Sequence, residues 1–252
     1  MARKKYQSPT SINTYRRCPH KYYLRYIKKL KGKPSIYLVR GIAVHEALAK
    51  FYDQNISDVH DIERLKVTLQ TLFHDAWSKQ AYIINQLELS QAELAEFYND
   101  SILMLMQWLN RYLNKASHTI VNPKTELKLF SKQHKLMGII DAVYEHKGNI
   151  ALIDYKTSKK DTVTDDIKIQ MGIYALLYQE NFGKKPAMVG VDFLKTGTKK
   201  FIRVNDSMID SAKKICREIQ IKTSSENIAD YPCTCGGWCK KDFVYKNENT
   251  SD

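Results

Sequence analysis

Two aspartates in neighbouring strand-like segments are the residues most able to do hydrolytic chemistry. Asp141 interrupts the apolar run of residues 136–143, and Asp154 ends the next apolar run. Between the runs, Lys147 and Gly148 suit a two-residue hairpin loop, because glycine tolerates positive φ. With that loop, residues whose numbers sum to 295 face each other, as Asp141 and Asp154 do. A loop shifted by one residue would still leave both on one face.

Opposed carboxylates in neighbouring strands indicate a cation site. Their Cβ atoms would be about 4.5–5.5 Å apart, so the two charges would repel each other. A divalent cation bound by oxygen ligands would offset this repulsion. Lys156 follows Asp154 by two residues and joins the same face, where an ammonium can stabilise charge on a phosphate or orient the attacking water. The alternative is that Lys156 only neutralises the two aspartates at a strand end.

The elements that must position these residues follow from the hydrophobic pattern. Helices are expected over about 10–30, 36–52 and 61–77, and another begins at the capping box of Ser90 and Glu93. Thr10 or Ser11 would cap the first helix. Residues 119–156 have the pattern of three strands; a helix over 164–179, strands over 187–194 and 201–204, and a helix over 206–221 follow. This order predicts one α/β sheet covered by helices and preceded by a helical segment.

Positive charge is concentrated at the start of the chain. The sequence has 40 Lys+Arg against 27 Asp+Glu, a net charge of +13, and residues 1–40 hold twelve basic residues and no acidic one. Six tyrosines are interleaved with these cations. Lysine and arginine neutralise phosphates while aromatic rings stack on bases, so the segment predicts nucleic-acid binding, with Arg16, Arg17 and Lys21 as candidates. A solvated basic face or an acidic protein partner is the alternative.

Five motifs follow one another along the chain. Two are the core residues Gly138-Ile139-Ile140-Asp141 and Ile153-Asp154-Tyr155-Lys156. The other three are Gln170 to Tyr174 (Q-x-x-x-Y), Gly41 to Glu46 (G-x-x-x-H-E) and Ser11 to Tyr23 (S-x-x-x-Y-x-x-C-P-x-K-Y-Y). Together, over about residues 8–243, they resemble the PD-(D/E)XK nuclease superfamily in its RecB-like exonuclease branch, which includes CRISPR-associated exonucleases. Ile140 replaces the proline of the superfamily name, but only the carboxylate is chemically required.

The resemblance implies a role for each matching residue. His45, Asp141 and Asp154 would bind Mg²⁺ or Mn²⁺ together with the backbone carbonyl of Tyr155, and Lys156 would be the catalytic lysine. One nitrogen ligand among oxygens would suit Mn²⁺ at least as well as Mg²⁺. Gln170 and Tyr174, one helical turn apart, would contact DNA beside the site.

Cysteines near both ends indicate a second metal site. Many members of this branch join one N-terminal and three C-terminal cysteines through a 4Fe–4S cluster, which implies Cys18, Cys233, Cys235 and Cys239 here. The C-x-C-x-x-x-C spacing departs from the family's more frequent pattern. Zinc could take the same four thiolates, or they could hold no metal. Cys216, in an amphipathic segment, is expected in the core.

Composition excludes several classes of protein. No apolar run approaches the about 20 residues of a membrane helix, no secretory signal follows the basic start, and five cysteines are too few for a disulfide scaffold. These features predict a soluble, cytoplasmic protein without a membrane partner. No phosphate-loop motif of an ATP motor occurs.

The sequence therefore predicts a restriction-endonuclease-like α/β fold with a mixed sheet flanked by helices. Residues 1–117 would form a basic helical region that carries the His45 motif, 118–243 the nuclease core and cysteine segment, and 244–252 a disordered tail. The expected function is a metal-dependent DNA exonuclease in repair, recombination or processing, with a helicase or other processing partner. A structure-selective endonuclease and a non-catalytic DNA-binding module are the alternatives.

Overall fold

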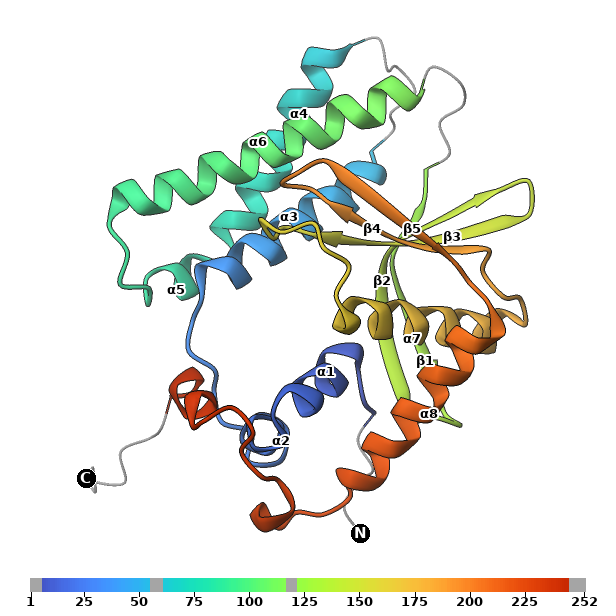
Figure 1. The fold of residues 1–252 in the computed structure, drawn as a ribbon. Coiled ribbons are helices and arrows are strands. Elements are labelled where there is room, and N and C mark those ends of the chain that lie inside the picture. The colour runs from blue at the N-terminus through green and yellow to red at the C-terminus, as the bar shows by residue number, and fades with distance from the viewer. Residues whose placement is uncertain (1–5, 55–60, 117–121, 245–252) are drawn as a thin grey trace.

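A five-stranded sheet forms the centre of the computed structural model, which describes residues 6–54, 61–116 and 122–244 (Figure 1). Its order is β1-β2-β3-β4-β5. The strands are β1 (Lys124–Ser131), β2 (Leu136–His146), β3 (Asn149–Lys156), β4 (Met188–Phe193) and β5 (Thr198–Arg203). β3 and β4 run parallel and are joined through helix α7 (Asp165–Phe182), whereas the other neighbours are antiparallel. The expected α/β fold with a mixed sheet is confirmed.

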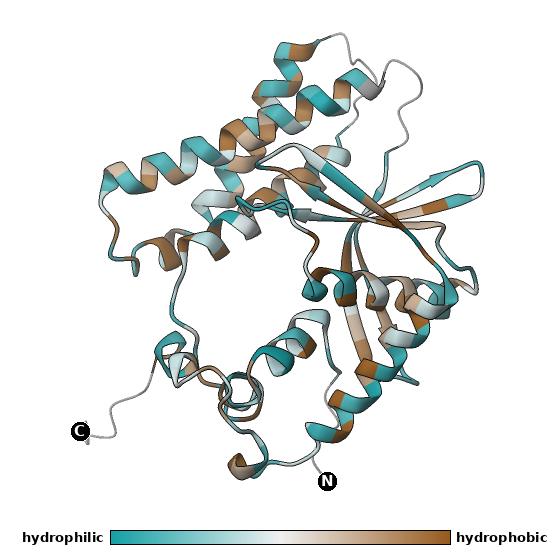
Figure 2. Ribbon diagram, in the orientation of Figure 1, coloured by the Kyte–Doolittle hydropathy of each residue, from teal (hydrophilic) through white to brown (hydrophobic). Residues whose placement is uncertain are grey.

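Helices cover both faces of this sheet. Helices α7 and α8 (Asp206–Lys222) pack on one face, and α3 (Ile36–Tyr52), α4 (Ile62–Ser78) and α6 (Gln91–Ala116) pack on the other (Figure 1). Successive strand residues point to opposite faces, so Ala142 joins the core under α3 whereas Val143 joins the core under α7. Hydrophobic and hydrophilic residues alternate along α4 and α8, as expected for helices with one buried side (Figure 2).

The turn between β2 and β3 sets the register that the sequence predicts. Lys147 and Gly148 have φ of 47° and 76°, the left-handed conformations of a tight hairpin loop. His146 pairs with Asn149, and the ladder continues to the pair of Ala142 with Ile153. The predicted pairing is confirmed up to the two aspartates, which come next along each strand.

The first expected helix is wrong in one respect, because it is broken in two. Helix α1 (Pro9–Arg17) ends before Pro19, and α2 (Pro19–Tyr22) continues into a π-helical turn, η1 (Tyr23–Ile27). Proline restricts the residue before it to extended conformations, and Cys18 has φ −161° and ψ 109°. The cap also differs: Ser8 is the N-cap and exchanges hydrogen bonds with Ser11, instead of Thr10 or Ser11 capping the helix.

The two ends of the chain pack against each other. Tyr22 and Tyr23 form a small core with Tyr231 and Phe243. The C-terminal segment adds two 3₁₀ turns, η2 (Ile228–Asp230) and η3 (Trp238–Asp242), which lie near α2 (Figure 1). Val244, the first residue of the expected disordered tail, donates its backbone N–H to the Lys31 carbonyl at 2.9 Å. The rest of that expected tail, 245–252, lies outside the described residues.

The other expected elements are present within a few residues of their predicted bounds. The strand pattern expected from 119 begins as β1 at Lys124, and its first residues, 119–121, lie outside the described part of the chain. A short helix, α5 (Ala81–Ile84), was not expected. No helix within residues 6–54, 61–116 and 122–244 is both long and apolar enough to cross a bilayer.

Candidate active site

The two aspartates lie at the edge of the hairpin, where β2 and β3 stop pairing. Asp141 is 8% exposed and Asp154 is 2% exposed. Past the last ladder pair, Asp141 Oδ2 accepts a hydrogen bond from the Tyr155 backbone N–H at 2.7 Å, so a side chain replaces a backbone partner there. Asp154 instead pairs across the sheet with Val191 of β4. Both aspartates thus stand on buried strands, and a backbone N–H holds the Asp141 carboxylate.

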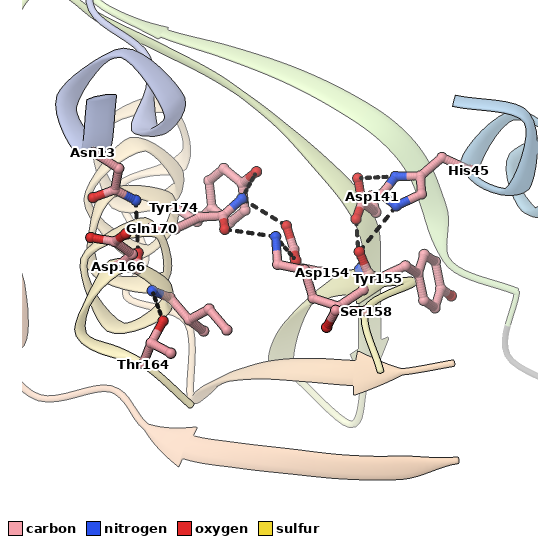
Figure 3. Close-up of polar contacts among 12 residues, drawn as sticks. Asn13, His45, Asp141, Asp154, Tyr155, Ser158, Thr164, Asp166, Gln170 and Tyr174 are labelled. Carbon is pink, nitrogen blue, oxygen red and sulfur yellow. Dashed lines mark hydrogen bonds and ion pairs between the residues drawn. The ribbon is translucent and has the colours of Figure 1, made fainter. Parts of the chain in front are cut away.

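His45 reaches this edge from α3 (Figure 3). Its Nδ1 is 3.2 Å from Asp141 Oδ1, and its Nε2 is 3.0 Å from the Tyr155 carbonyl oxygen. Burial alone would lower the pKa of His45, but the hydrogen bond and the charge of Asp141 outweigh it, so the pKa is raised. The structure therefore brings together the three residues that the G-x-x-x-H-E and core motifs singled out.

Lys156 and Gln170 form the other half of the site. Lys156 Nζ lies 2.7 Å from Asp154 Oδ2 and donates to Gln170 Oε1 at 2.9 Å. Gln170 Nε2 lies 2.8 Å from Asp154 Oδ1 and 2.9 Å from the Tyr174 hydroxyl, donating to both (Figure 3). Burial raises the pKa of Asp154, although Lys156 opposes the shift. Tyr174 is 5% exposed, so its hydroxyl supports Gln170 from inside; contact of this pair with DNA stays a prediction.

A cluster of tyrosines fixes the backbone of Tyr155 from the opposite side. The Tyr155 hydroxyl is 3.1 Å from that of Tyr52, which is 2.7 Å from that of Tyr144. Burial raises the pKa of Tyr52 and Tyr155 well above the usual value, so both remain protonated donors. Because the Tyr155 amide contacts Asp141 and its carbonyl contacts His45, this packing also fixes both of those side chains.

The donor set fits a hard divalent cation. An imidazole nitrogen, the Asp141 carboxylate and a backbone carbonyl converge, and Asp154 is near enough for its charge to act on His45; this is the chemistry that Mg²⁺ and Mn²⁺ accept. The 3.0 Å between His45 Nε2 and the Tyr155 carbonyl matches neighbouring ligands of an octahedral ion with bonds of about 2.1 Å. Asp154 Oδ2 is buried and accepts no hydrogen bond of good geometry, although Lys156 lies beside it. Such a carboxylate oxygen is a suitable metal ligand.

A cleft of about 320 Å³ leads to Lys156 between α1 and α7. Arg17, Asn13 and Gln170 are among the residues that line it. Arg16 and Arg17 lie 2.9 and 2.6 Å from Asp166 of α7, and Lys21 lies 2.5 Å from Asp242. Arg17 therefore lines the cleft and Arg16 shares its acidic partner, whereas Lys21 pairs with the C-terminal segment; contact of the three with DNA stays a prediction.

Two residues near the site were missed by sequence reasoning. Arg40, counted among the basic residues of the first forty, is 2% exposed and donates to the Thr157 carbonyl at 3.0 Å. Glu126 of β1 comes within 4.8 Å of ligand atoms of His45 and Asp141. The sequence places Glu126 in a strand but does not show which residue of the next strand it faces. The turn between β1 and β2 contains no glycine that would mark its position and so set the register.

The cysteines from the two ends do converge. Four sulfur atoms lie within 4.8 Å of one another, those of Cys18, Cys233, Cys235 and Cys239. Backbone N–H groups of Gly237 and Cys239 donate to sulfurs of the C-terminal loop. Although burial opposes it, hydrogen bonds from the backbone of Lys21 and Thr234 lower the pKa of Cys18 to about 6, which favours a thiolate.

Cys216 stands apart from this group, as the sequence predicts. It is 1% exposed in the core beside α7, and burial raises its pKa to about 12. It therefore behaves as an apolar core residue.

Comparison with known proteins identifies the family of this site. The sequence profile of the PD-(D/E)XK nuclease superfamily matches residues 6–241. The chain belongs to this superfamily of nucleases, and the resemblance inferred from the five motifs is confirmed.

Two relatives are similar to the chain. It is 32% identical over 105 residues to the CRISPR-associated exonuclease Cas4 of Francisella tularensis subsp. novicida (strain U112). That match covers 41% of this chain and 52% of the relative, so the chain spans about half the length of the protein it matches. The crystal structure of a "putative exonuclease" from Eubacterium rectale shares the fold, with a TM-score of 0.57, 15% identity, and coverage of 98% of this chain and 91% of that chain.

Proposed function

We propose that the protein is a divalent-metal-dependent DNA exonuclease that acts at DNA ends or in single strands. The observation that supports this most is the convergence of His45, Asp141, Asp154 and Lys156 beside a cleft lined with basic and amide side chains. A protein that only binds DNA would not need this combination of four residues. The name of the Cas4 relative favours an exonuclease over a structure-selective endonuclease. DNA repair, recombination or processing, with a helicase-type partner, is the setting that this activity fits.

His45, Asp141, Asp154 and the Tyr155 carbonyl would hold Mg²⁺ or Mn²⁺. When bound, such a cation polarises the phosphate and lowers the pKa of water. The chain's own contribution is rigidity: the Tyr155 amide and carbonyl hold Asp141 and His45, and Lys156 and Gln170 hold Asp154. Ligands that are fixed before the metal arrives need not be ordered when it binds.

Lys156 would stabilise the transition state of phosphodiester hydrolysis. Water adds to phosphorus, the bond from phosphorus to the leaving sugar oxygen breaks, and that oxygen takes up a proton. Negative charge builds on the phosphate oxygens during this step, and the Lys156 ammonium borders the cleft where they would lie. Gln170 holds Lys156 and Asp154 at once, so it would keep the ammonium aimed at the phosphate.

Arg16, Arg17 and Lys21 would guide the DNA backbone into the cleft. Asp166 and Asp242 occupy their charged groups in the absence of DNA. These pairs are exposed, and exposed ion pairs contribute only about 0–1 kcal/mol, so a phosphate can replace the carboxylate at little cost.

The four converging cysteines would hold a 4Fe–4S cluster that ties the two chain ends together. Cys18 comes from the break between α1 and α2 and the other three from the C-terminal loop, so neither end alone closes the site. An iron–sulfur cluster would give brown protein with absorbance near about 400 nm. Colourless protein with stoichiometric zinc would assign zinc instead, and metal-free protein would mean unligated thiols.

End-labelled single- and double-stranded DNA, incubated with Mg²⁺ or Mn²⁺, tests the activity. A ladder that shortens from one end is the expected result, with loss of cleavage in EDTA. Asp154→Asn and Lys156→Ala should abolish cleavage while the fold is retained, because one weakens the metal site and the other removes charge stabilisation. Asp165→Asn, an exposed aspartate on the first turn of α7, is the matched control and should cut normally.

Mid-strand cuts would favour the endonuclease instead. No cutting with retained DNA binding would leave only the binding module. Wild-type, EDTA-sensitive cleavage by folded Asp154→Asn would overturn the catalytic assignment itself.

A further inference from the structure

Glu126 extends the row of carboxylates across three neighbouring strands. Thr125 pairs with Ala142 and Leu127 with Ile140, so Glu126 stands opposite Asp141 although the ladder skips this pair. On the other side of β2, the register of the hairpin places Asp154 of β3 opposite Asp141. Adjacent strands are about 4.8 Å apart, so three acidic residues are lined up side by side across the sheet.

The ligand atoms nearest one another in the site are those of Glu126, His45 and Asp141. One atom from each lies within 4.8 Å of the other two. Asp154 is engaged elsewhere, because Lys156 and Gln170 contact its two oxygens at 2.7 and 2.8 Å. As the side chains stand, a cation that enters between His45 and Asp141 meets Glu126 as readily as Asp154.

Electrostatics and backbone conformation both argue that Glu126 would be unfavourable here without a cation. Its φ of 48° is in the left-handed region, which a non-glycine strand residue rarely adopts. The Glu126 side chain is exposed, and within the described part of the chain no group donates a hydrogen bond to its carboxylate or forms an ion pair with it. A like charge directly opposite Asp141 destabilises the strand pair. Independently, Asp154 Oδ2 in the same pocket is buried and accepts no hydrogen bond of good geometry, although Lys156 Nζ lies 2.7 Å away, which leaves this oxygen able to bind a cation.

We infer that Glu126 is a further ligand of the divalent cation, binding it from β1 opposite the ligands of β2 and β3. This inference rests on the proposed metal-dependent function. It goes beyond it by adding a carboxylate that the five motifs do not contain. With Glu126, side chains from α3, β1, β2 and β3 surround the ion, and three carboxylates carry more negative charge than one divalent cation neutralises. Lys156 beside Asp154 then balances the remainder.

Metal binding without DNA tests this assignment separately from catalysis. Mn²⁺ affinity of the full chain would be measured by calorimetry and by the loss of the free-Mn²⁺ electron paramagnetic resonance signal. Glu126→Gln should weaken Mn²⁺ binding by at least about 10-fold. Loss of a residue that supports a metal site typically weakens binding by about 10–100-fold. Glu126→Asp, which keeps the charge on a shorter side chain, should recover part of the loss. Glu145→Gln, an exposed glutamate at the far end of β2, should bind as wild type.

The outcomes separate this inference from the proposed function. If Asp141→Asn weakens Mn²⁺ binding but Glu126→Gln does not, the Glu126 assignment is wrong and the metal site stands. If neither change alters Mn²⁺ binding, both the assignment and the proposed metal site are wrong. Without metal, Glu126→Gln should resist urea at least as well as wild type, because the repulsion with Asp141 is removed. A weaker affinity that comes with a destabilised fold would therefore count against direct ligation.

Discussion

Arg40 offers the sharpest test of how the basic residues are divided between fold and function. It is one of twelve basic residues in the first forty, yet it is 2% exposed inside α3. Its Nη1 lies 3.2 Å from Asp100 Oδ2, and its Nη2 donates to the Thr157 carbonyl at 3.0 Å. Thr157 directly follows Lys156, so this hydrogen bond anchors the end of β3 at the active site. We expect Arg40 to stabilise the fold and not to bind phosphate.

The magnitude for Arg40→Met follows from these contacts. Losing a charged hydrogen bond to the half-buried Thr157 carbonyl costs about 2 kcal/mol. Asp100 keeps Lys195 as a partner, so the broken pair adds only about 1 kcal/mol and not the larger penalty of an orphaned charge. The lost contacts of the guanidinium with the rings of Tyr37 and Phe97 are offset by relief of its own desolvation. The free energy of unfolding should fall by about 3 kcal/mol.

Urea unfolding followed by circular dichroism measures this loss, and the melting temperature should fall by about 6–12 °C in a chain of this size. DNA binding by the folded variant should keep the wild-type dependence on salt concentration. Arg25→Met is the matched control, since Arg25 is exposed and should change stability by less than about 0.5 kcal/mol. The reasoning would be refuted if the unfolding free energy of Arg40→Met lay within about 0.5 kcal/mol of wild type. It would also be refuted if the slope of log K against log salt fell by the amount that one lost phosphate contact produces.

Three further predictions concern other parts of the site. Gly138→Ala should lower the free energy of unfolding in urea by about 1–3 kcal/mol and slow cleavage, because the added Cβ would lie 2.8 Å from Leu177 Cδ1 and 3.2 Å from the Tyr174 ring that supports Gln170. The control Gly41→Ala, with nothing within 4 Å of its Cβ, should instead stabilise α3. Equal effects of the two changes would contradict this prediction. Replacing Arg16, Arg17 and Lys21 with Ala should weaken binding to all sequences and reduce the slope of log K against log salt by about 0.7–0.9 per lost contact; an unchanged slope would mean that these side chains face only solvent and their acidic partners. Cys18→Ser should lower metal content and melting temperature together, whereas Cys216→Ser should leave the metal content unchanged; equal metal content in Cys18→Ser and wild type would exclude a shared site.

The sequence determined those features that short segments encode. Ser90 and Glu93 exchange hydrogen bonds at the start of α6, as their spacing predicts, because a capping box needs only three residues of separation. The loop at Lys147 and Gly148 set the pairing of β2 with β3, because a two-residue turn leaves the strands one register. The placement of Asp141 and Asp154 at one edge was therefore predictable. Pro19 also encodes the break after α1, a local signal that the apolar stripe concealed.

Only the tertiary structure decided which charged residues are buried and which long-range neighbours meet. Arg40 is as basic as Arg17 in the sequence, but α3 places it against Asp100 and Thr157, whereas α1 leaves Arg17 at the cleft. Glu126 reached Asp141 only through the register of β1, which a turn without glycine does not fix. These outcomes depend on packing between segments far apart in the chain. Side-chain burial and strand register are set there by the whole core, and no short pattern carries that information.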